Sequence, residues 1–159
     1  MRVFVIAGEA SGDRLGAALM DGLNSLRADV EFIGGGGPMM QARGLESLFP
    51  MDELSVMGLA EIVPKYFHLK ARLEQTAQAA IAARPDVMVT IDSPDFCLRV
   101  ARRVKRATSI RTVHYVAPSV WAGRSGRAGK MAQVIDHVLA LLPFEPPLMR
   151  AAGMECDFV

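Results

Sequence analysis

Residues 87–98 read VMVTIDSPDFCL, a stretch that combines an apolar strand, a polar turn and the start of a helix. Its first five residues are apolar or β-branched without polar alternation, which is typical of a parallel strand covered by helices on both faces. Pro94 favours the first position of a helix, where its missing N–H is not needed. Asp95 then lies in the first helical turn, where the helix dipole stabilises a carboxylate by about 0.3–1 kcal/mol, whereas Asp92 at the strand end has no such role.

Strand and helix alternate in the same way along the whole chain. Strands are predicted at 2–7, 30–33, 85–91, 110–116 and 137–142, and the last residues, CDFV, resemble the start of another. Helices are predicted at 15–26, 38–43, 65–83, 95–106, 127–135 and 146–153. This order predicts one α/β domain with a doubly wound, parallel, Rossmann-like sheet, in which ligands bind at the carboxyl ends of the strands.

The composition narrows the class of protein. With 159 residues, 51% of them hydrophobic and 22% charged, the chain is expected to be one globular domain, and its net charge of +1 gives no general reason to bind nucleic acid. Cys97 and Cys156 indicate a reduced, cytosolic protein, although a bridge between them is left open. No uninterrupted apolar run reaches about 18 residues, so any membrane contact is expected to be peripheral. The scattered histidines and the missing G-x-G-x-x-G motif predict neither a metal nor a dinucleotide cofactor.

Two glycine-containing turns follow the first two predicted strands. In GEASGD, residues 8–13, Gly8 and Gly12 let a ligand approach the backbone, while Ser11 and Asp13 are explained as helix caps. Glu9 has no capping role, and its carboxylate suits a sugar hydroxyl better than a phosphate. The glycines of GGGGP, residues 34–38, allow either a tight turn or a close ligand.

Further candidates lie in the second half of the chain. The loop APSVWAGRSGRAG, residues 117–129, carries Ser119, Trp121 and Arg124; the tryptophan is expected to dock or to stack on a ligand, and the arginine can hold a phosphate. His114, inside a predicted strand, is expected to be a core histidine. The basic run RVARRVKR, residues 99–106, favours a solvated helix face, with an anionic membrane surface as the alternative.

The stretch LSVMGLAEIVPKYFHLKARL, residues 54–73, interrupts the regular alternation. Its apolar side chains are flanked by Lys65, Lys70 and Arg72, a pattern that suits a lipid surface or acyl chains as well as a core. The candidates for membrane or acyl contact are Val56, Met57, Leu59, Ile62, Val63, Phe67 and Leu69.

Several motifs in order, AGEASGD, GGPMM, LSVMGLAEI, IDSPDF, HYVAPSVWA and LALLPFE, resemble the N-terminal half of the lipid-A-disaccharide synthase family. The resemblance implies an inverting glycosyltransferase of the GT-B architecture in the lipid A pathway of Gram-negative bacteria. Its substrates would be UDP-2,3-diacylglucosamine and 2,3-diacylglucosamine 1-phosphate, and its products a β-1′,6-linked disaccharide phosphate and UDP. It also implies a cytoplasmic enzyme peripheral to the inner membrane that needs no metal or cofactor.

The same resemblance assigns roles to individual residues. Asp92 matches the proposed general base, and Glu9 matches an acidic residue implicated in the site. Gly8, Ser11 and Gly12 are the substrate-binding candidates of the first turn, and Ser119, Trp121 and Arg124 those of the later loop. The sequence departs from the family at Ser93, Cys97 and Gly123, where alanine, asparagine and tryptophan are usual.

The resemblance also carries an expectation about domains. Residues 1–159 would form the acceptor-side domain, and the nucleotide-sugar-binding half expected after CDFV is absent from this sequence. The chain by itself is therefore not expected to turn over. The alternative is a non-catalytic module that binds acceptor lipid or membrane, and a homo-oligomer is left open.

Overall fold

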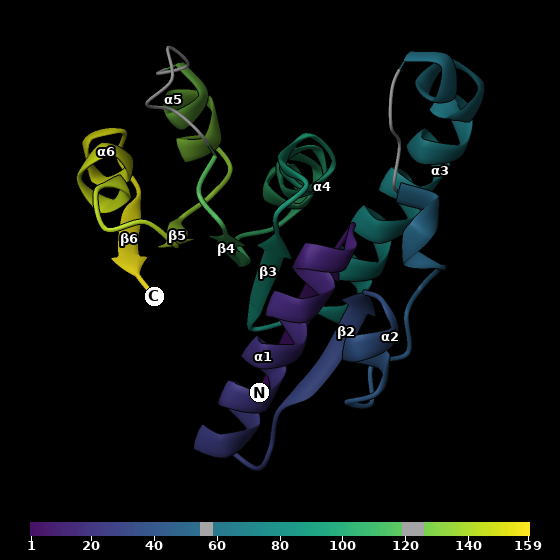
Figure 1. The fold of residues 1–159 in the computed structure, drawn as a ribbon, viewed down its shortest axis with the longest axis horizontal. Coiled ribbons are helices and arrows are strands. Elements are labelled where there is room, and N and C mark those ends of the chain that lie inside the picture. Colours follow the sequence, from purple (N-terminus) through teal and green to yellow (C-terminus); the bar gives the residue numbers. More distant parts are fainter. Residues whose placement is uncertain (55–58, 119–125) are drawn as a thin grey trace.

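The computed structural model describes residues 1–54, 59–118 and 126–159, with only the backbone for 59–64. The described residues contain one parallel sheet of six strands in the order β2-β1-β3-β4-β5-β6 (Figure 1). The strands are β1 (Arg2–Ala7), β2 (Glu31–Gly35), β3 (Val87–Ile91), β4 (Arg111–Tyr115), β5 (His137–Ala140) and β6 (Glu155–Phe158). The predicted parallel α/β sheet is confirmed.

Helices cover both faces of this sheet, so successive strand residues are buried on opposite sides. Val3 and Val89 pack with α1 and α2, whereas Phe4 and Met88 pack with α3, α4, α5 and α6. This explains why the strands are apolar without alternation. The helices are α1 (Ala10–Leu26), α2 (Pro38–Gln41), the short 3₁₀ helix η1 (Met51–Leu54), α3 (Leu59–Ala83), α4 (Pro94–Ala107), α5 (Gly126–Ala132) and α6 (Glu145–Ala151).

The strand order reverses between β1 and β3. From β1 the chain moves outward to β2, then returns to place β3 on the other side of β1 and continues to β6. At such a switch point the connections after the two central strands diverge, and a crevice opens at their carboxyl ends. The loops after β1 and β3 are therefore where a ligand site is expected.

Several predicted boundaries were wrong, and three of them change how the residues near the switch point and in α3 are placed. Helix α1 begins at Ala10, so Ser11 and Gly12 lie in its first turn instead of in a loop. Helix α3 begins at Leu59, so Pro64 lies inside the helix that it was expected to bound. A proline removes one backbone hydrogen bond, but packing against α4 holds the long helix that follows it. Gly34 and Gly35 belong to β2, so half of the predicted glycine loop is strand.

Gly34 allows β2 to approach β1 closely. Its φ is +141°, and a Cβ there would lie 1.8 Å from the carbonyl oxygen of Val5.

Asp13 stabilises the turn that follows β2. Its carboxylate accepts hydrogen bonds from the backbone N–H groups of Gly37, Met39 and Met40, each at 3.0 Å. Asp13 was predicted to cap its own helix, but it caps α2 instead, because α1 begins three residues earlier.

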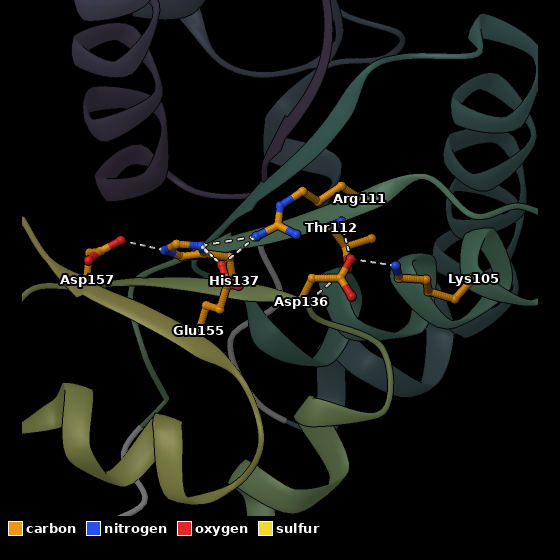
Figure 2. A network of polar contacts seen from close by, with 7 residues as sticks. All are labelled: Lys105, Arg111, Thr112, Asp136, His137, Glu155 and Asp157. Atoms are coloured by element: carbon orange, nitrogen blue, oxygen red, sulfur yellow. Dashed lines mark hydrogen bonds and ion pairs between the residues drawn. The ribbon is translucent and has the colours of Figure 1, made fainter.

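A polar network ties together the amino-terminal ends of β4, β5 and β6 (Figure 2). The two ring nitrogens of His137 lie 3.2 Å from Glu155 Oε2 and 2.7 Å from Asp157 Oδ2, and Arg111 donates to Glu155. Next to it, Asp136 accepts hydrogen bonds from Lys105 Nζ of α4 and from the backbone N–H of Thr112. These groups lie at the amino-terminal ends of the strands, whereas the switch-point loops lie at the carboxyl ends. We therefore infer that the network stabilises the fold and is not part of the ligand site.

Candidate functional site

Four side chains meet where β1 and β3 end. Ala7 and Ile91 are paired in register, so the residues that follow them, Glu9 and Asp92, leave the sheet side by side. The hydroxyl of Ser11 donates to Asp92 Oδ2 at 3.3 Å, and the hydroxyl of Ser93 donates to Glu9 Oε1 at 3.4 Å. We call Glu9, Ser11, Asp92 and Ser93 the switch-point cluster. Three of them were site candidates from the sequence.

Gly8 and Gly12 allow the two loops to approach each other. A Cβ on Gly8 would lie 2.8 Å from Ser93 Oγ, and a Cβ on Gly12 would lie 3.3 Å from the carbonyl oxygen of Ile91. Both glycines thus have a packing explanation at this place in the fold. Their predicted contact with substrate stays a prediction.

The backbone is strained around the cluster. Asp92, Ser93 and Val116 have φ values of 53°, 41° and 81°, in the left-handed region that non-glycine residues rarely adopt. Each such residue costs about 1–3 kcal/mol and persists only where its neighbours hold it. Here the N–H of Asp92 donates to the carbonyl of Tyr115, and the N–H of Val116 to that of Leu139. Strain of this kind gathers at functional sites, and the sequence pattern gave no signal for it.

Burial and neighbouring side chains change the pKa of Glu9. Partial burial raises the pKa of Glu9, and Asp92 raises it further through charge repulsion and a side-chain hydrogen bond, while the hydroxyl of Ser93 lowers it. A carboxyl group whose pKa is raised by burial and by a neighbouring carboxylate is a common feature of sites for acid–base chemistry. The cluster can therefore accept a proton from a hydroxyl and hold that hydroxyl in place.

The structure separates the two aspartates of the opening stretch. Pro94 occupies the first turn of α4, and Asp95 follows it there, as predicted. Ser93 precedes the helix but its side chain makes no capping hydrogen bond. Instead its hydroxyl faces Glu9, a contact that the sequence did not suggest because Ser93 was noted only as a departure from the family pattern.

His114 lies on β4 beside the cluster and is fully buried, which confirms the prediction of a core histidine. Its Nδ1 lies 2.7 Å from the hydroxyl of Thr90 on β3. Burial lowers the pKa of His114 to about 4, against the opposing charge of Asp92. The ring is thus neutral near neutral pH, and within the described part of the chain its Nε2 has no hydrogen-bond partner.

The apolar candidates for lipid contact are only partly described. Phe67 is 79% exposed and stacks edge-to-face on Tyr66, which is also exposed, with exposed lysines at positions 65 and 70. Leu69 is half-buried. Arg72 is not an unpaired cation at the border of this surface, because it forms an ion pair with Glu53. Val56 and Met57 lie outside the described residues, and so do the side chains of Leu59, Ile62 and Val63.

The loop candidates Ser119, Trp121 and Arg124 also lie outside the described residues. Within residues 1–54, 59–118 and 126–159, no group of three or more His, Cys, Asp and Glu side chains is arranged to hold a metal ion. Cys97 and Cys156 are buried and not bridged. Among the helices of the described chain, none is long and apolar enough to span a bilayer.

Comparisons with known proteins show what this chain is similar to. A family model described as lipid-A-disaccharide synthetase matches residues 3–159. The chain is 73% identical to the lipid-A-disaccharide synthase of Ruegeria pomeroyi and 49% identical to that of Pseudomonas aeruginosa, in each case over 159 residues and all of this chain. These residues make up 40% and 42% of the two relatives, so the chain spans about two-fifths of their length.

A solved structure shares the fold. The crystal structure of Glycyrrhiza uralensis UGT73P12, complexed with glycyrrhetinic acid 3-O-monoglucuronide, matches 99% of this chain and 48% of that protein with a TM-score of 0.61. At 14% identity this likeness shows the fold alone. It agrees with the predicted Rossmann-like domain.

Proposed function

Because this chain belongs to the lipid-A-disaccharide synthase family, we propose that it is the acceptor-side domain of an inverting GT-B glycosyltransferase. The reaction joins UDP-2,3-diacylglucosamine to 2,3-diacylglucosamine 1-phosphate and releases UDP. The observation that carries the proposal is the switch-point cluster, where Ser11 holds Asp92 and Ser93 holds Glu9. The cluster lies at the place where α/β sheets bind their ligands.

In this proposal Asp92 is the general base. The 6-hydroxyl of the acceptor attacks the anomeric carbon of the donor, a new C–O bond forms, and the bond to the UDP oxygen breaks. Asp92 takes the hydroxyl proton as the bond forms, a contribution of about 10²–10⁴-fold for a well-placed base. Its hydrogen bond from Ser11 fixes the carboxylate, and the strained backbone directs the residue at the end of β3.

Glu9 has a different role, and both its partial burial and the neighbouring Asp92 raise its pKa. A protonated Glu9 can donate a hydrogen bond, while an ionised one can accept a bond from a second sugar hydroxyl. In both forms it positions the acceptor for attack. Positioning of two bound reactants supplies a large part of the rate enhancement in such reactions.

The start of α3 supports a peripheral contact with the inner membrane or with acyl chains. Phe67 and Tyr66 expose apolar rings between Lys65 and Lys70, an arrangement that suits an anionic lipid surface. These exposed rings also favour the second candidate function, a module that binds acceptor lipid or membrane without catalysis. A cytoplasmic protein that works at the membrane surface fits either function.

A transfer assay distinguishes the two functions. We define the exchange protein as the Ruegeria pomeroyi relative in which this chain replaces the matching 159 residues. If the proposal holds, the exchange protein forms disaccharide and UDP from the two diacylglucosamine substrates. An exchange protein that folds and binds lipid vesicles but forms no disaccharide supports the binding module instead.

A further inference from the structure

Helices α4 and α5 enclose a groove that the proposed reaction does not use. Its volume is about 410 Å³, and it begins at the first turn of α4, directly after the switch-point cluster. Arg99 and Arg102 line it from α4, and Arg127 and Lys130 line it from α5. One carboxylate, Asp95, shares the groove with these four cations.

Within the described residues, the cations of the groove form no ion pair with a carboxylate. Other basic residues of α4 are neutralised: Arg103 pairs with Glu74, and Lys105 pairs with Asp136. In the part of the chain that the structure describes, no ion pair is formed by the groove residues Arg99, Arg102, Arg127 and Lys130. Helix α4 therefore pairs two of its cations with carboxylates and has two in the groove, while Arg106 is exposed outside the groove.

The arrangement of these charges selects a ligand class. Cations that converge on a concave site from two helices suit a compact anion, whereas a nucleic-acid backbone needs an extended stripe of charge. One arginine guanidinium group can bind two phosphate oxygens at once. The positive end of the α4 dipole adds to the field of these cations. The apolar side chains of Leu98 and Val134 also line the groove.

We propose that the α4–α5 groove binds a phosphate group carried by a sugar phosphate or by a lipid headgroup. The proposal rests on the groove and its unpaired cations, not on the transfer reaction. One end of the groove is formed by the first turn of α4, next to Ser93. A sugar phosphate that enters from this end places its sugar next to Ser93. A headgroup bound there instead places α4 and α5 against the membrane surface.

The test compares matched variants of the exchange protein by calorimetric titration with glucose 1-phosphate. The double variant Arg102→Gln/Lys130→Gln removes one cation from each helix, and we expect it to weaken binding by about tenfold or more. Arg106→Gln removes an exposed cation of the same helix that does not line the groove, and it should leave binding unchanged. Asp95→Asn removes the opposing carboxylate and should tighten binding, a gain that misfolding cannot imitate.

Vesicle sedimentation with phosphatidylcholine, with and without phosphatidylglycerol, identifies the source of the phosphate. Groove-dependent binding of glucose 1-phosphate assigns a sugar-phosphate site, and groove-dependent binding of anionic vesicles alone assigns a headgroup site; both support the proposal. It is overturned if neither ligand responds to the double variant, or if Arg106→Gln weakens binding equally. If the exchange protein forms disaccharide but gives either of these results, the groove proposal is wrong while the proposed function still holds.

Discussion

The hydroxyl of Ser11 donates a hydrogen bond to Asp92 at 3.3 Å, although 81 residues separate the two in the sequence. The contact joins the first turn of α1 to the end of β3 across the switch point of the sheet. It holds a carboxylate whose backbone is already strained, with a φ of 53°. In the proposed function, this contact orients the carboxylate that takes the proton of the acceptor hydroxyl.

The first prediction concerns the titration of Glu9. Because Asp92 raises the pKa of Glu9, Asp92→Asn should lower it, and because the hydroxyl of Ser93 lowers it, Ser93→Ala should raise it further. Carbon-detected NMR of the Glu9 carboxyl group across a pH series measures both changes. If the two variants shift the pKa in the same direction, the coupling described for this cluster is wrong.

The second prediction concerns His114 and the pH dependence of stability. Burial lowers the pKa of His114 from 6.5 to about 4 in the folded protein. Between pH 6.5 and about 4, the unfolded chain therefore binds a proton at His114 that the folded chain does not. Falling pH from 6.5 to about 4 therefore favours unfolding, with a loss on the order of 2–3 kcal/mol.

The replacement His114→Gln should remove this component, because glutamine does not titrate. Urea unfolding of both proteins at several pH values measures the difference between the two profiles, in which contributions common to both, such as that of Asp136, cancel. Parallel profiles between pH 6.5 and about 4 would contradict the buried, neutral state of the ring.

The third prediction compares two glycines. Gly34→Ala places a Cβ 1.8 Å from the carbonyl oxygen of Val5 in a backbone conformation that alanine avoids, and it should cost more than about 4 kcal/mol or prevent folding. Gly22→Ala, at an exposed position of helix α1 where an added Cβ would have nothing within 4 Å, should stabilise the protein by about 0.5–1 kcal/mol. Thermal unfolding measures both, and similar effects at the two positions would mean that β2 is not seated as described.

The fourth prediction concerns the lipid surface. Phe67→Ser should reduce sedimentation of the exchange protein with anionic vesicles, because it removes an exposed ring at the start of α3. Leu26→Ser is the matched control: Leu26 is the last residue of α1 and is 81% exposed, so this variant should have no effect. Equal losses in the two variants would show nonspecific adhesion instead of a defined contact.

The sequence predicted the fold well because strands such as β1 and β3 are apolar on both faces and because each of the first five strands is followed by a helix. It placed Glu9 and Asp92 at strand ends, and parallel pairing then brings them together without further information. It did not predict the partner of Ser93, the role of Asp13 at α2 or the strain at Val116. These features depend on contacts between loops that are far apart in the sequence, and local sequence patterns do not predict such contacts. The groove between α4 and α5 was missed for a related reason: the basic run 99–106 predicts a charged face, but not which cations lack partners.

The central claim is that Asp92 is the base, and Asp92→Asn in the exchange protein tests it most directly. Asparagine tolerates the left-handed backbone at this position, so the variant should fold while losing the proton acceptor. Asp86→Asn, at the opposite end of β3, is the matched control. We predict that kcat for disaccharide formation falls by about 10²–10⁴-fold for Asp92→Asn and stays within about twofold for Asp86→Asn. A folded Asp92→Asn protein whose kcat remains within about threefold of the parent would contradict the account.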